Sequence, residues 1–598
     1  MPSYRLALLV VVFCVSSLAF AQTRGGSGSR GTGSYVNPAT DARNAAVLGK
    51  GDNSNLSIVH LNSASDEAKV EFRSQTVLIQ VPVVVTDRSG KHLHGLNKED
   101  FTVFENGKPV TVANFEELTA STSPLTIPPT PAGQFHNLIL DGSQPRNVVV
   151  IALDTVNTSF LDQTYGRREL VKFLAHNLDS GQVLSLMLIT SHGLKVVQGL
   201  SGDSAHLMQA LNKAAGEISP METMSADAQE AVAAGSSPMF GQQGRSGGDS
   251  VLQRLDQFVQ YGDAVEAQFV QSNAIETTMN AFLGIAWSLS GVPGRKSLIW
   301  ATGGFPFALD SPSTVPGGYL SLLYERTMLA LNDAQISVYP VDIRGLANSP
   351  SFVNGNNSGA FSGTAVSRQT TNRMWLQQSK IDILNDFADM TGGKAFYNTN
   401  DLAGSFKRAA DDASSYYMLG YYLDTKNTKP GWRKVQVKVG KKDAEVRARN
   451  GFFVTNATMN PLLSRDRDMA NALHSPIEGT GVGMTVQWVG VAADGDKKKT
   501  VFSAHMPGGG LSFEGGGRSQ LNFDFAALAY DKDGKEAGQT ARNYAPVVPD
   551  AQVASVRANG MDFRNALELA PGKYTVRFVV RDNVTGKVGS VTAPLTVN

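Results

Sequence analysis

The chain has 598 residues, which is enough for several domains of ordinary size. Its 53 basic and 53 acidic side chains balance, so no overall charge favours nucleic acid or an anionic membrane as the partner. Cys14 is the only cysteine and lies in the apolar N-terminal segment. Removal of that segment leaves no thiol, which excludes disulfides, cysteine nucleophiles and thiolate metal sites.

The N-terminus is typical of a secretory signal at residues 1–21. Arg5 precedes an apolar run at residues 6–15, and Ala19-Phe20-Ala21 has the small residues of a cleavage site. The run is too short to span a bilayer. We therefore expect an exported protein that keeps no transmembrane anchor after cleavage and that resides in the periplasm, on the outer surface or outside the cell.

Two segments of different character follow the signal. Residues 22–73 are rich in Gly, Ser and Asn and predict a disordered arm. From Thr76, apolar residues alternate with other residues over about ten positions, and Asn106-Gly107 is a strong signal for a β-hairpin. These patterns predict a small β module at residues 74–120, followed by a Pro-rich linker.

The central part of the chain, residues 144–415, alternates apolar runs with amphipathic segments. A Met/Gln/Gly/Ser-rich stretch at residues 216–250 predicts an insertion. Strands separated by helices of this length indicate βαβ units. The predicted buried strands are residues 148–153, 183–189, 297–301 and 336–341.

The rest of the chain is strand-like. Residues 416–455 contain short alternating strands and predict a β appendage, whereas residues 482–598 predict a β-sandwich of immunoglobulin-like architecture. The predicted class is therefore α/β. It consists of a doubly wound, mostly parallel sheet flanked by a small N-terminal β module and a C-terminal β-sandwich.

Polar side chains follow the first buried strand of the central domain. Asp154 ends that strand, and hydroxyl and amide side chains come directly after it. Ligands of open α/β sheets bind at the carboxyl ends of the strands. The alternative is that Asp154 caps the next helix and orders the turn. The predicted binding surface consists of Asp154, Asn157, Thr158, Ser159, Thr302 and Asp342.

Several short segments together carry a resemblance to a known family. They are residues 81–87, 100–107, 153–159, 294–306, 391–401 and 415–421. The chain resembles the exported, acidobacterial-type proteins related to the von Willebrand factor type A (VWFA) domain. The resemblance covers roughly residues 74–455 and, more weakly, the C-terminal sandwich. It implies a VWFA/Rossmann-like central domain.

VWFA domains commonly carry a metal-ion-dependent adhesion site, in which oxygen ligands hold Mg²⁺. Asp154 matches the first aspartate of that motif and Thr158 can replace its second serine. Val156 stands where the first serine is expected and cannot ligate, and Thr302 stands where a later strand usually delivers aspartate. The resemblance thus implies a degenerate site, with Asp154 and Thr158 as metal ligands and either no cofactor or weakly bound Mg²⁺ or Mn²⁺.

Any further oxygen ligands would come from other loops. The candidates are Thr277 or Thr278, Asn157, Ser159 and Asp342.

Enzyme motifs are weak in this sequence. The Gly-x-Ser-x-Gly match at residues 244–248 follows no apolar strand, and residues 531–534 resemble an EF-hand start but have Arg542 at the closing position. We therefore expect a non-enzymatic, exported interaction or adhesion protein that binds another protein or a cell-surface polymer. The alternatives are a true Mg²⁺-dependent adhesin, an envelope hydrolase, the scaffold of an enzyme complex, and a purely structural role.

Overall fold

The computed structural model describes residues 76–120, 131–137, 147–176, 182–202, 204–215, 250–305, 319–346, 381–424, 429, 431–454, 461–494, 497–514 and 519–598. The predicted signal (1–21), the predicted arm (22–73) and all but the last residue of the predicted insertion (216–250) lie outside these residues. No helix within the described ranges is both long and apolar enough to cross a lipid bilayer.

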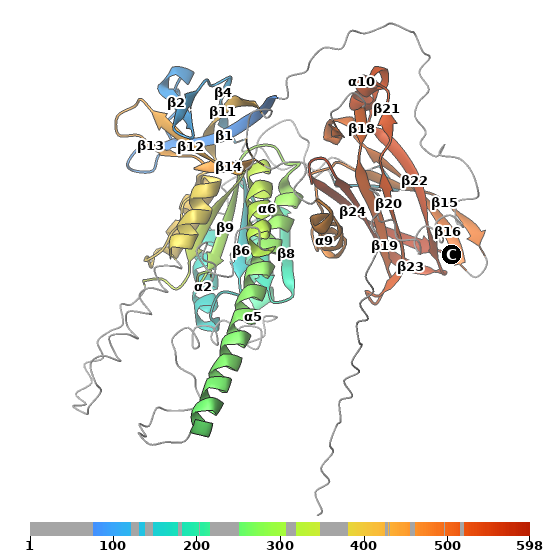
Figure 1. The fold of residues 1–598 in the computed structure, drawn as a ribbon, viewed down its shortest axis with the longest axis horizontal. Helices are drawn as coiled ribbons and strands as arrows, with labels where there is room; N and C mark the ends of the chain where they lie inside the picture. Colours follow the sequence, from blue (N-terminus) through green and yellow to red (C-terminus); the bar gives the residue numbers. More distant parts are fainter. Residues whose placement is uncertain are drawn as a thin grey trace, which may run out of the picture. The chain divides into compact units, whose positions relative to one another are not determined.

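A five-stranded sheet forms the centre of residues 147–411 (Figure 1). Its order is β10-β9-β6-β7-β8, with the first four strands parallel and β8 antiparallel to β7. Every residue of β6, β7, β9 and β10 is buried, which explains why these segments read as continuous apolar runs. The strands are β6 (Val148–Asp154), β7 (Val183–Thr190), β8 (Gly193–Ser201), β9 (Lys296–Thr302) and β10 (Ile336–Asp342).

Helices cover both faces of this sheet. On one face, α5 (Ser250–Leu289), α6 (Tyr319–Asp333) and the helical residues 381–391 share a core with Val148, Val150 and Ala152. On the other face, the intervening residues of β6 pack with three further helices. These are α2 (Phe160–His176), α3 (Ser204–Ala215) and α8 (Leu402–Asp411). Each buried aliphatic side chain contributes about 1.5–3 kcal/mol through removal from water.

The predicted fold class, α/β with a doubly wound, mostly parallel sheet, is wrong as a description of this chain, because the sheet with parallel strands is one of six sheets in the described residues. The part of the chain that the structure describes is mostly β, with 44% in strands and 30% in helices. Among the described residues, parallel ladders occur in one sheet, and the other five sheets are antiparallel throughout. The prediction relied on the four buried apolar runs of the central sheet. The fold class is instead decided by the more numerous antiparallel strands outside that sheet.

Strands from two distant segments pair with each other in a separate β module. Its two sheets have the orders β13-β1-β11-β4 and β14-β12-β2-β3. Residues 76–119 and 415–454 thus share one core, although the sequence places them in two separate predicted units. The strands are β1 (Thr76–Thr86), β2 (Phe101–Glu105), β3 (Lys108–Val110), β4 (Asn114–Thr119), β11 (Ser415–Asp424), β12 (Gly431–Val439), β13 (Glu445–Arg447) and β14 (Gly451–Val454).

The C-terminal part contains two four-stranded antiparallel sheets around a common core, and a smaller three-stranded sheet. The larger sheets have the orders β22-β16-β15-β5 and β20-β19-β23-β24, and the small one is β17-β18-β21. Their strands are β5 (Gln134–His136), β15 (Thr485–Asp494), β16 (Lys497–Met506), β17 (Phe513–Glu514), β18 (Ser519–Leu521), β19 (Phe523–Tyr530), β20 (Glu536–Tyr544), β21 (Val547–Val548), β22 (Met561–Leu569), β23 (Gly572–Asp582) and β24 (Val588–Val597). The helices of this region are α9 (Pro461–His474) and α10 (Asp550–Asn559).

A buried arginine ties the central sheet to the β module. Arg295 precedes β9 and is 1% exposed. Its guanidinium donates to five oxygen atoms: Ser337 Oγ (3.1 Å), Tyr339 Oη (2.8 Å), Gly392 O (2.7 Å), Asp412 O (2.9 Å) and Asp412 Oδ2 (3.3 Å). All five N–H groups are therefore satisfied away from water.

Asp412 completes this network from the end of α8. Its carboxylate also accepts hydrogen bonds from Tyr339 and from Arg447 of β13. Burial by itself would raise the pKa of Asp412, but the positive charges of Arg295 and Arg447 outweigh it and hold that pKa below its usual value. The ion pair is therefore charged, and it joins β9, β10, α8 and β13.

Lys296, the next residue, is buried without such compensation. It is 1% exposed, and its ammonium group donates to Val292 O at 2.5 Å. Burial lowers the pKa of Lys296 to about 7. A charged lysine in this position costs free energy. Lys296 therefore lowers the free energy of unfolding at pH values where its ammonium group stays protonated in the folded chain.

Replacement of Arg295 by Met is expected to reduce the free energy of unfolding by about 3–5 kcal/mol, because Asp412 then stays buried with half of its compensation lost. Chemical denaturation measures the change. Arg408→Met is the control, since Arg408 forms an exposed pair with Asp401 that contributes at most about 1 kcal/mol. If the Met variant does not fold, Tyr339→Phe should still lose about 1 kcal/mol. Equal stability of Arg295→Met and wild type would disprove the role given to this network.

Lys296→Met is expected to stabilise the protein near pH 6 and to flatten its pH dependence. The unfolded chain keeps this lysine protonated to about pH 10.4, whereas the folded chain releases the proton near pH 7. Between these values the unfolded state binds more protons, so wild-type stability rises with pH by up to about 1.4 kcal/mol per unit. Urea titrations at pH 6, 8 and 9.5 test this, with the exposed Lys407→Met as control. Parallel pH profiles for wild type and Lys296→Met would refute it.

Candidate functional site

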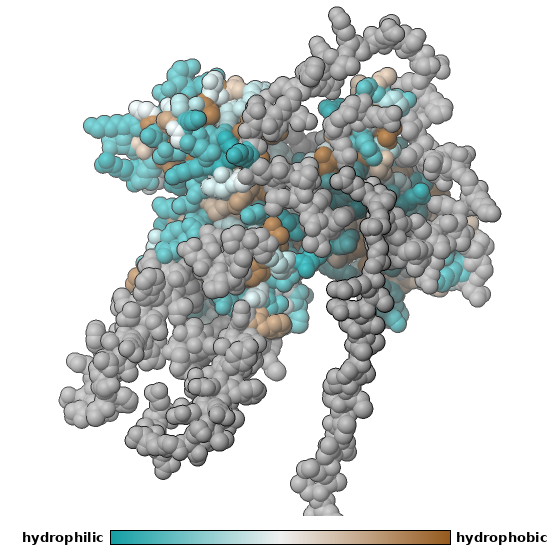
Figure 2. All heavy atoms as spheres, viewed as in Figure 1, coloured by the Kyte–Doolittle hydropathy of each residue, from teal (hydrophilic) through white to brown (hydrophobic). Residues whose placement is uncertain are grey.

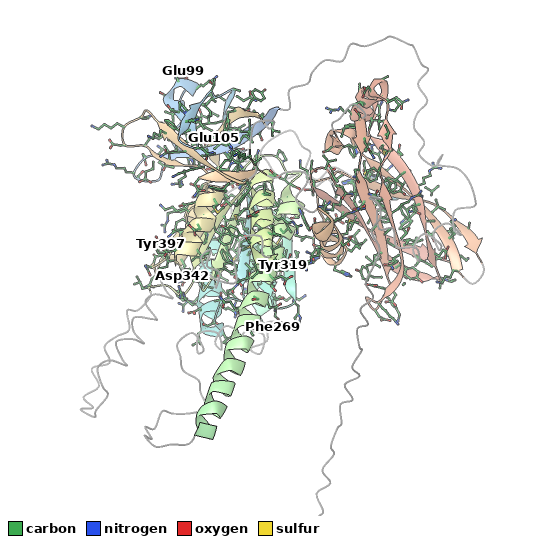
Figure 3. All side chains as sticks on the ribbon, in the orientation of Figure 1. Glu99, Glu105, Phe269, Tyr319, Asp342 and Tyr397 are labelled. Atoms are coloured by element: carbon green, nitrogen blue, oxygen red, sulfur yellow. The ribbon has the colours of Figure 1, made fainter. Side chains whose placement is uncertain are left out.

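The candidate site lies at the carboxyl ends of the central parallel strands. Asp154, Thr302 and Asp342 are the last residues of β6, β9 and β10, and all three are buried. Asp342 is labelled in Figure 3. Because parallel strands end at the same edge of a sheet, these side chains come from three strands to one edge. Thr158 is also fully buried, while Asn157 and Ser159 are partly exposed.

Asp154 is 1% exposed and accepts hydrogen bonds on both oxygens. Oδ1 accepts from the backbone N–H groups of Val156 (3.1 Å) and Asn157 (3.0 Å). Oδ2 accepts from Asn157 Nδ2 (2.8 Å) and Trp300 Nε1 (3.0 Å). Thr302 Oγ1 lies 3.1 Å from Oδ2 and 2.8 Å from Gly304 O, so its one hydrogen is shared between two acceptors. Every one of these donors is neutral.

The electrostatic balance at Asp154 follows from this arrangement. Burial raises the pKa of its carboxyl group, and the hydrogen bonds from Asn157, Trp300 and Thr302 oppose that shift. The carboxyl group is thus held by dipoles, and its main role in the structure is to organise the backbone that follows β6.

Thr158 links the loop after β6 to the loop after β9. Its Oγ1 accepts a hydrogen bond from Gly303 N at 2.8 Å. The two loops approach so closely that a Cβ on residue 303 would lie 3.0 Å from Asn157 O and 3.2 Å from the Cα of Thr158. A side chain at position 303 would therefore require these neighbours to shift by a few tenths of an ångström.

Two amide side chains beside Asp154 retain free acceptors. Asn157 Nδ2 also donates to Thr278 Oγ1 of α5 at 3.0 Å, and Gln163 Nε2 donates to Thr155 O (3.2 Å) and Thr158 O (2.8 Å). The buried oxygens Asn157 Oδ1 and Gln163 Oε1 have no hydrogen-bond partner in the described part of the chain. Of the two threonines considered from the sequence, Thr278 is therefore the one near the site.

Ser159 and Asp342 have other partners. Ser159 Oγ donates to Asp162 Oδ2 at 2.7 Å and accepts from Asp162 N at 3.3 Å, which caps the start of α2. Asp342 accepts a bidentate pair from Arg344, with Nε at 2.9 Å and Nη2 at 2.7 Å. The structure therefore brings Asp154, Asn157 and Thr302 into direct contact, joins Thr158 through Gly303, and gives Ser159 and Asp342 separate local roles.

The side chains around Asp154 do not provide a ligand set that fits a divalent cation. Mg²⁺ requires near-octahedral oxygen ligands at about 2.0–2.1 Å, but the Asp154 oxygens already face N–H and O–H hydrogens. Trp300 offers only a donor, and Val156 offers no side-chain oxygen. In the described residues no group of three or more His, Cys, Asp or Glu side chains is arranged to hold a metal ion.

Trp300 and Gln163 are the site residues that the sequence prediction did not include. A signal for Trp300 was present: it lies two positions before Thr302 in the same strand, so both side chains point to the same face. Gln163 lies on α2, four residues after Ser159, and gave no comparable signal. Its importance comes from its burial.

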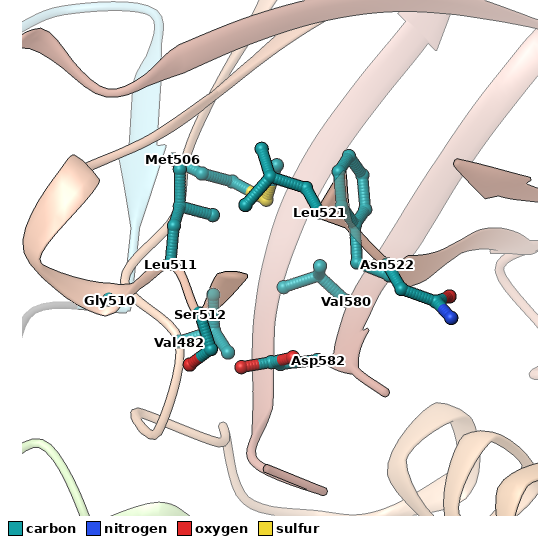
Figure 4. A pocket seen from close by; sticks show the side chains of 10 residues that line it. Val482, Met506, Gly510, Leu511, Ser512, Leu521, Asn522, Val580 and Asp582 are labelled. Atoms are coloured by element: carbon teal, nitrogen blue, oxygen red, sulfur yellow. The ribbon is translucent and has the colours of Figure 1, made fainter. Parts of the chain in front are cut away.

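Small cavities occur at the end of β6 and, separately, in the C-terminal sheets. One, of about 10 Å³, lies between the end of β6 and α2 and is lined by Leu153, Asp154, Thr155, Gln163, Arg167 and Ile343. Another of about 10 Å³ lies in the C-terminal sheets beside Met506, Leu521 and Asp582 (Figure 4). Each has room for roughly one water molecule, so neither can enclose an organic substrate.

Apolar side chains are exposed on the segments that follow two of the central parallel strands. Leu161, at the start of α2, is 79% exposed, and Leu346, just after β10, is 53% exposed. Tyr165 lies between them: it is one helical turn from Leu161, and its ring would be 3.6 Å from a Cβ on Gly345. We call Leu161, Tyr165 and Leu346 the rim patch. Elsewhere, hydrophobic residues are scattered among hydrophilic ones on the face shown in Figure 2.

Comparisons with known proteins give little support for any assignment. No protein-family model matches the chain, and no curated protein matches it. Among solved structures, a β-glucuronidase of Bacteroides uniformis is similar over 30% of this chain and 19% of its own, with 11% sequence identity and a TM-score of 0.14. A likeness this weak carries no conclusion about fold or activity. The resemblance to VWFA domains stays a prediction.

Thr158→Val is expected to destabilise the protein by about 1–3 kcal/mol, because the shape is kept while the buried Gly303 N–H loses its acceptor. Thr158→Ser keeps the oxygen and should cost much less. Thermal unfolding of both variants measures the difference. Equal losses for Val and Ser would show that the hydrogen bond to Gly303 does not hold these loops together.

Proposed function

We propose that this chain is an exported, non-enzymatic binding protein that engages another protein or a cell-surface polymer through the carboxyl-end edge of its central sheet. The observation that carries the proposal is the rim patch. Leu161, at the start of α2, and Leu346, just after β10, expose large aliphatic side chains on the segments that follow Asp154 and Asp342. Exposed apolar groups on a rigid frame are typical anchors of a protein interface.

The frame beneath the rim patch supports this proposal. Tyr165 donates to Asn400 O at 3.2 Å, and Asn400 Oδ1 accepts from Leu346 N at 3.1 Å. Asn400, in the segment before α8, thereby holds the Tyr165 side chain of α2 and the backbone at Leu346. A side chain held like that of Tyr165 loses little freedom on binding, which favours affinity.

The polar centre supports a binding role more than a catalytic one. Asp154 is enclosed by neutral donors, and Ser159 donates to Asp162 rather than to a base of the histidine type. The adjoining cavity has room for about one water molecule. Export is supported by the signal-like residues 1–21, and the VWFA resemblance agrees with an adhesive role.

The double variant Leu161→Glu/Leu346→Glu is expected to lose at least about tenfold in affinity for the partner, because two exposed apolar anchors that the partner would cover are each replaced by a charge. Immobilised mature protein is incubated with envelope proteins and with purified envelope polymers, and the bound fraction is quantified. Val547→Glu is the matched control, since Val547 is also exposed but lies on β21.

The result that would contradict this function is capture of the same ligands, in the same amounts, by wild type and by the double variant. Turnover of esterase, peptidase or glycosidase substrates that is lost on substitution of Asp154 would favour the hydrolase alternative instead.

A further inference from the structure

Trp300 is fixed in the core below Asp154. It is fully buried in the centre of β9, and its ring lies 5.0 Å from Phe282, 5.3 Å from Phe305 and 5.4 Å from Phe387, measured between centroids. All three contacts are edge-to-face, which is a favourable geometry for aromatic rings. The indole therefore cannot turn away from Asp154 unless three neighbouring rings are repacked.

The indole N–H points at the carboxylate. Trp300 Nε1 donates to Asp154 Oδ2 at 3.0 Å, on the same oxygen that accepts from Asn157 Nδ2. An indole nitrogen has no acceptor capacity, so it cannot become a ligand. A cation that approached Oδ2 would have to displace a donor that the core holds in place.

The register of the strands explains why this donor reaches the site. Trp300 pairs with Ala152 of β6, two residues before Asp154, and lies on the same face of β9 as Thr302. Ala152, the residue paired with Trp300 in the register, has a small side chain. The donor is thus delivered by the sheet itself and does not depend on a mobile loop.

We propose that the Trp300 indole N–H, together with Asn157, takes the place that a divalent cation would occupy at Asp154, so that this edge of the sheet is held together without metal. Asp154 then acts as an internal acceptor that joins β6, β9 and the loop at residues 155–158. Ligand binding at the rim patch is consequently independent of Mg²⁺ and Mn²⁺. This last consequence rests on the proposed function, whereas the hydrogen-bonded arrangement does not.

The first test is calorimetric titration of MgCl₂ and of MnCl₂ into the full mature protein, paired with thermal unfolding in chelator and in millimolar metal. We expect no saturable heat and no change of the unfolding midpoint with either metal. Saturable binding to wild type that is lost in Asp154→Asn would overturn the proposal.

The second test separates a hydrogen-bonded centre from a metal site by the stability of variants in chelator. Asp154→Asn places an N–H₂ group or a weaker acceptor against Trp300, and should lower the midpoint by roughly 2–6 °C. In a metal site lacking its metal, the same change removes an uncompensated charge and would leave the midpoint unchanged or raise it. That second outcome would also overturn the proposal.

A double-mutant cycle tests the pair directly. Trp300→Phe retains a buried ring and removes the donor, and Trp287→Phe is the control, since Trp287 is buried among Leu283, Ala472 and Val588. The combined loss in Trp300→Phe/Asp154→Asn should be smaller than the sum of the single losses, because both remove the same interaction. Trp287→Phe should add to Asp154→Asn without coupling. Additivity in both cycles would contradict a direct Trp300–Asp154 interaction.

No binding partner is used in any of these tests, so failure of the rim-patch experiment would leave their outcome unaffected.

Discussion

The buried pair of Arg295 and Asp412 is the interaction on which the arrangement of the chain depends. Five oxygens surround one guanidinium, and they come from β10, from the residues after the 381–391 helix and from the end of α8. Arg447 reaches the same carboxylate from β13. A charged group in the interior is tolerated only when it is fully paired, so these elements cannot separate one at a time. The network therefore couples the parallel strands to the β module.

The opposite end of the same sheet solves a similar problem without charge pairs. Asp154 is as deeply buried as Asp412, but its partners are two backbone N–H groups, an amide, an indole and a shared hydroxyl. Burial shifts the carboxyl pKa upward there, whereas the arginines shift it downward at Asp412. A buried ion pair thus holds the end of the sheet where β9 begins. Neutral hydrogen-bond donors hold the loops at the carboxyl ends of the strands.

The sequence predicted elements well where the signal was local. The apolar runs before Asp154, Thr302 and Asp342 are buried strands, and Asn106-Gly107, with φ of 47° and 79°, turns a hairpin between β2 and β3. It failed where partners are distant. β1 pairs with β11 more than three hundred residues later, and β5 joins β15, so the dominance of antiparallel sheets was not readable from local periodicity. Asp154 was predicted as a site residue from its place at a strand end. The role of Trp300 was not, because it depends on the register between β6 and β9.

We propose that the contact surface of this chain needs no ion to order it. The most direct measurement is a crystal of the full mature protein soaked in MnCl₂, with diffraction data collected at the manganese absorption edge. We predict no anomalous density at Asp154 and an unchanged hydrogen bond from Trp300 Nε1 to Oδ2. A manganese peak coordinated by Asp154, with the indole displaced, would contradict it.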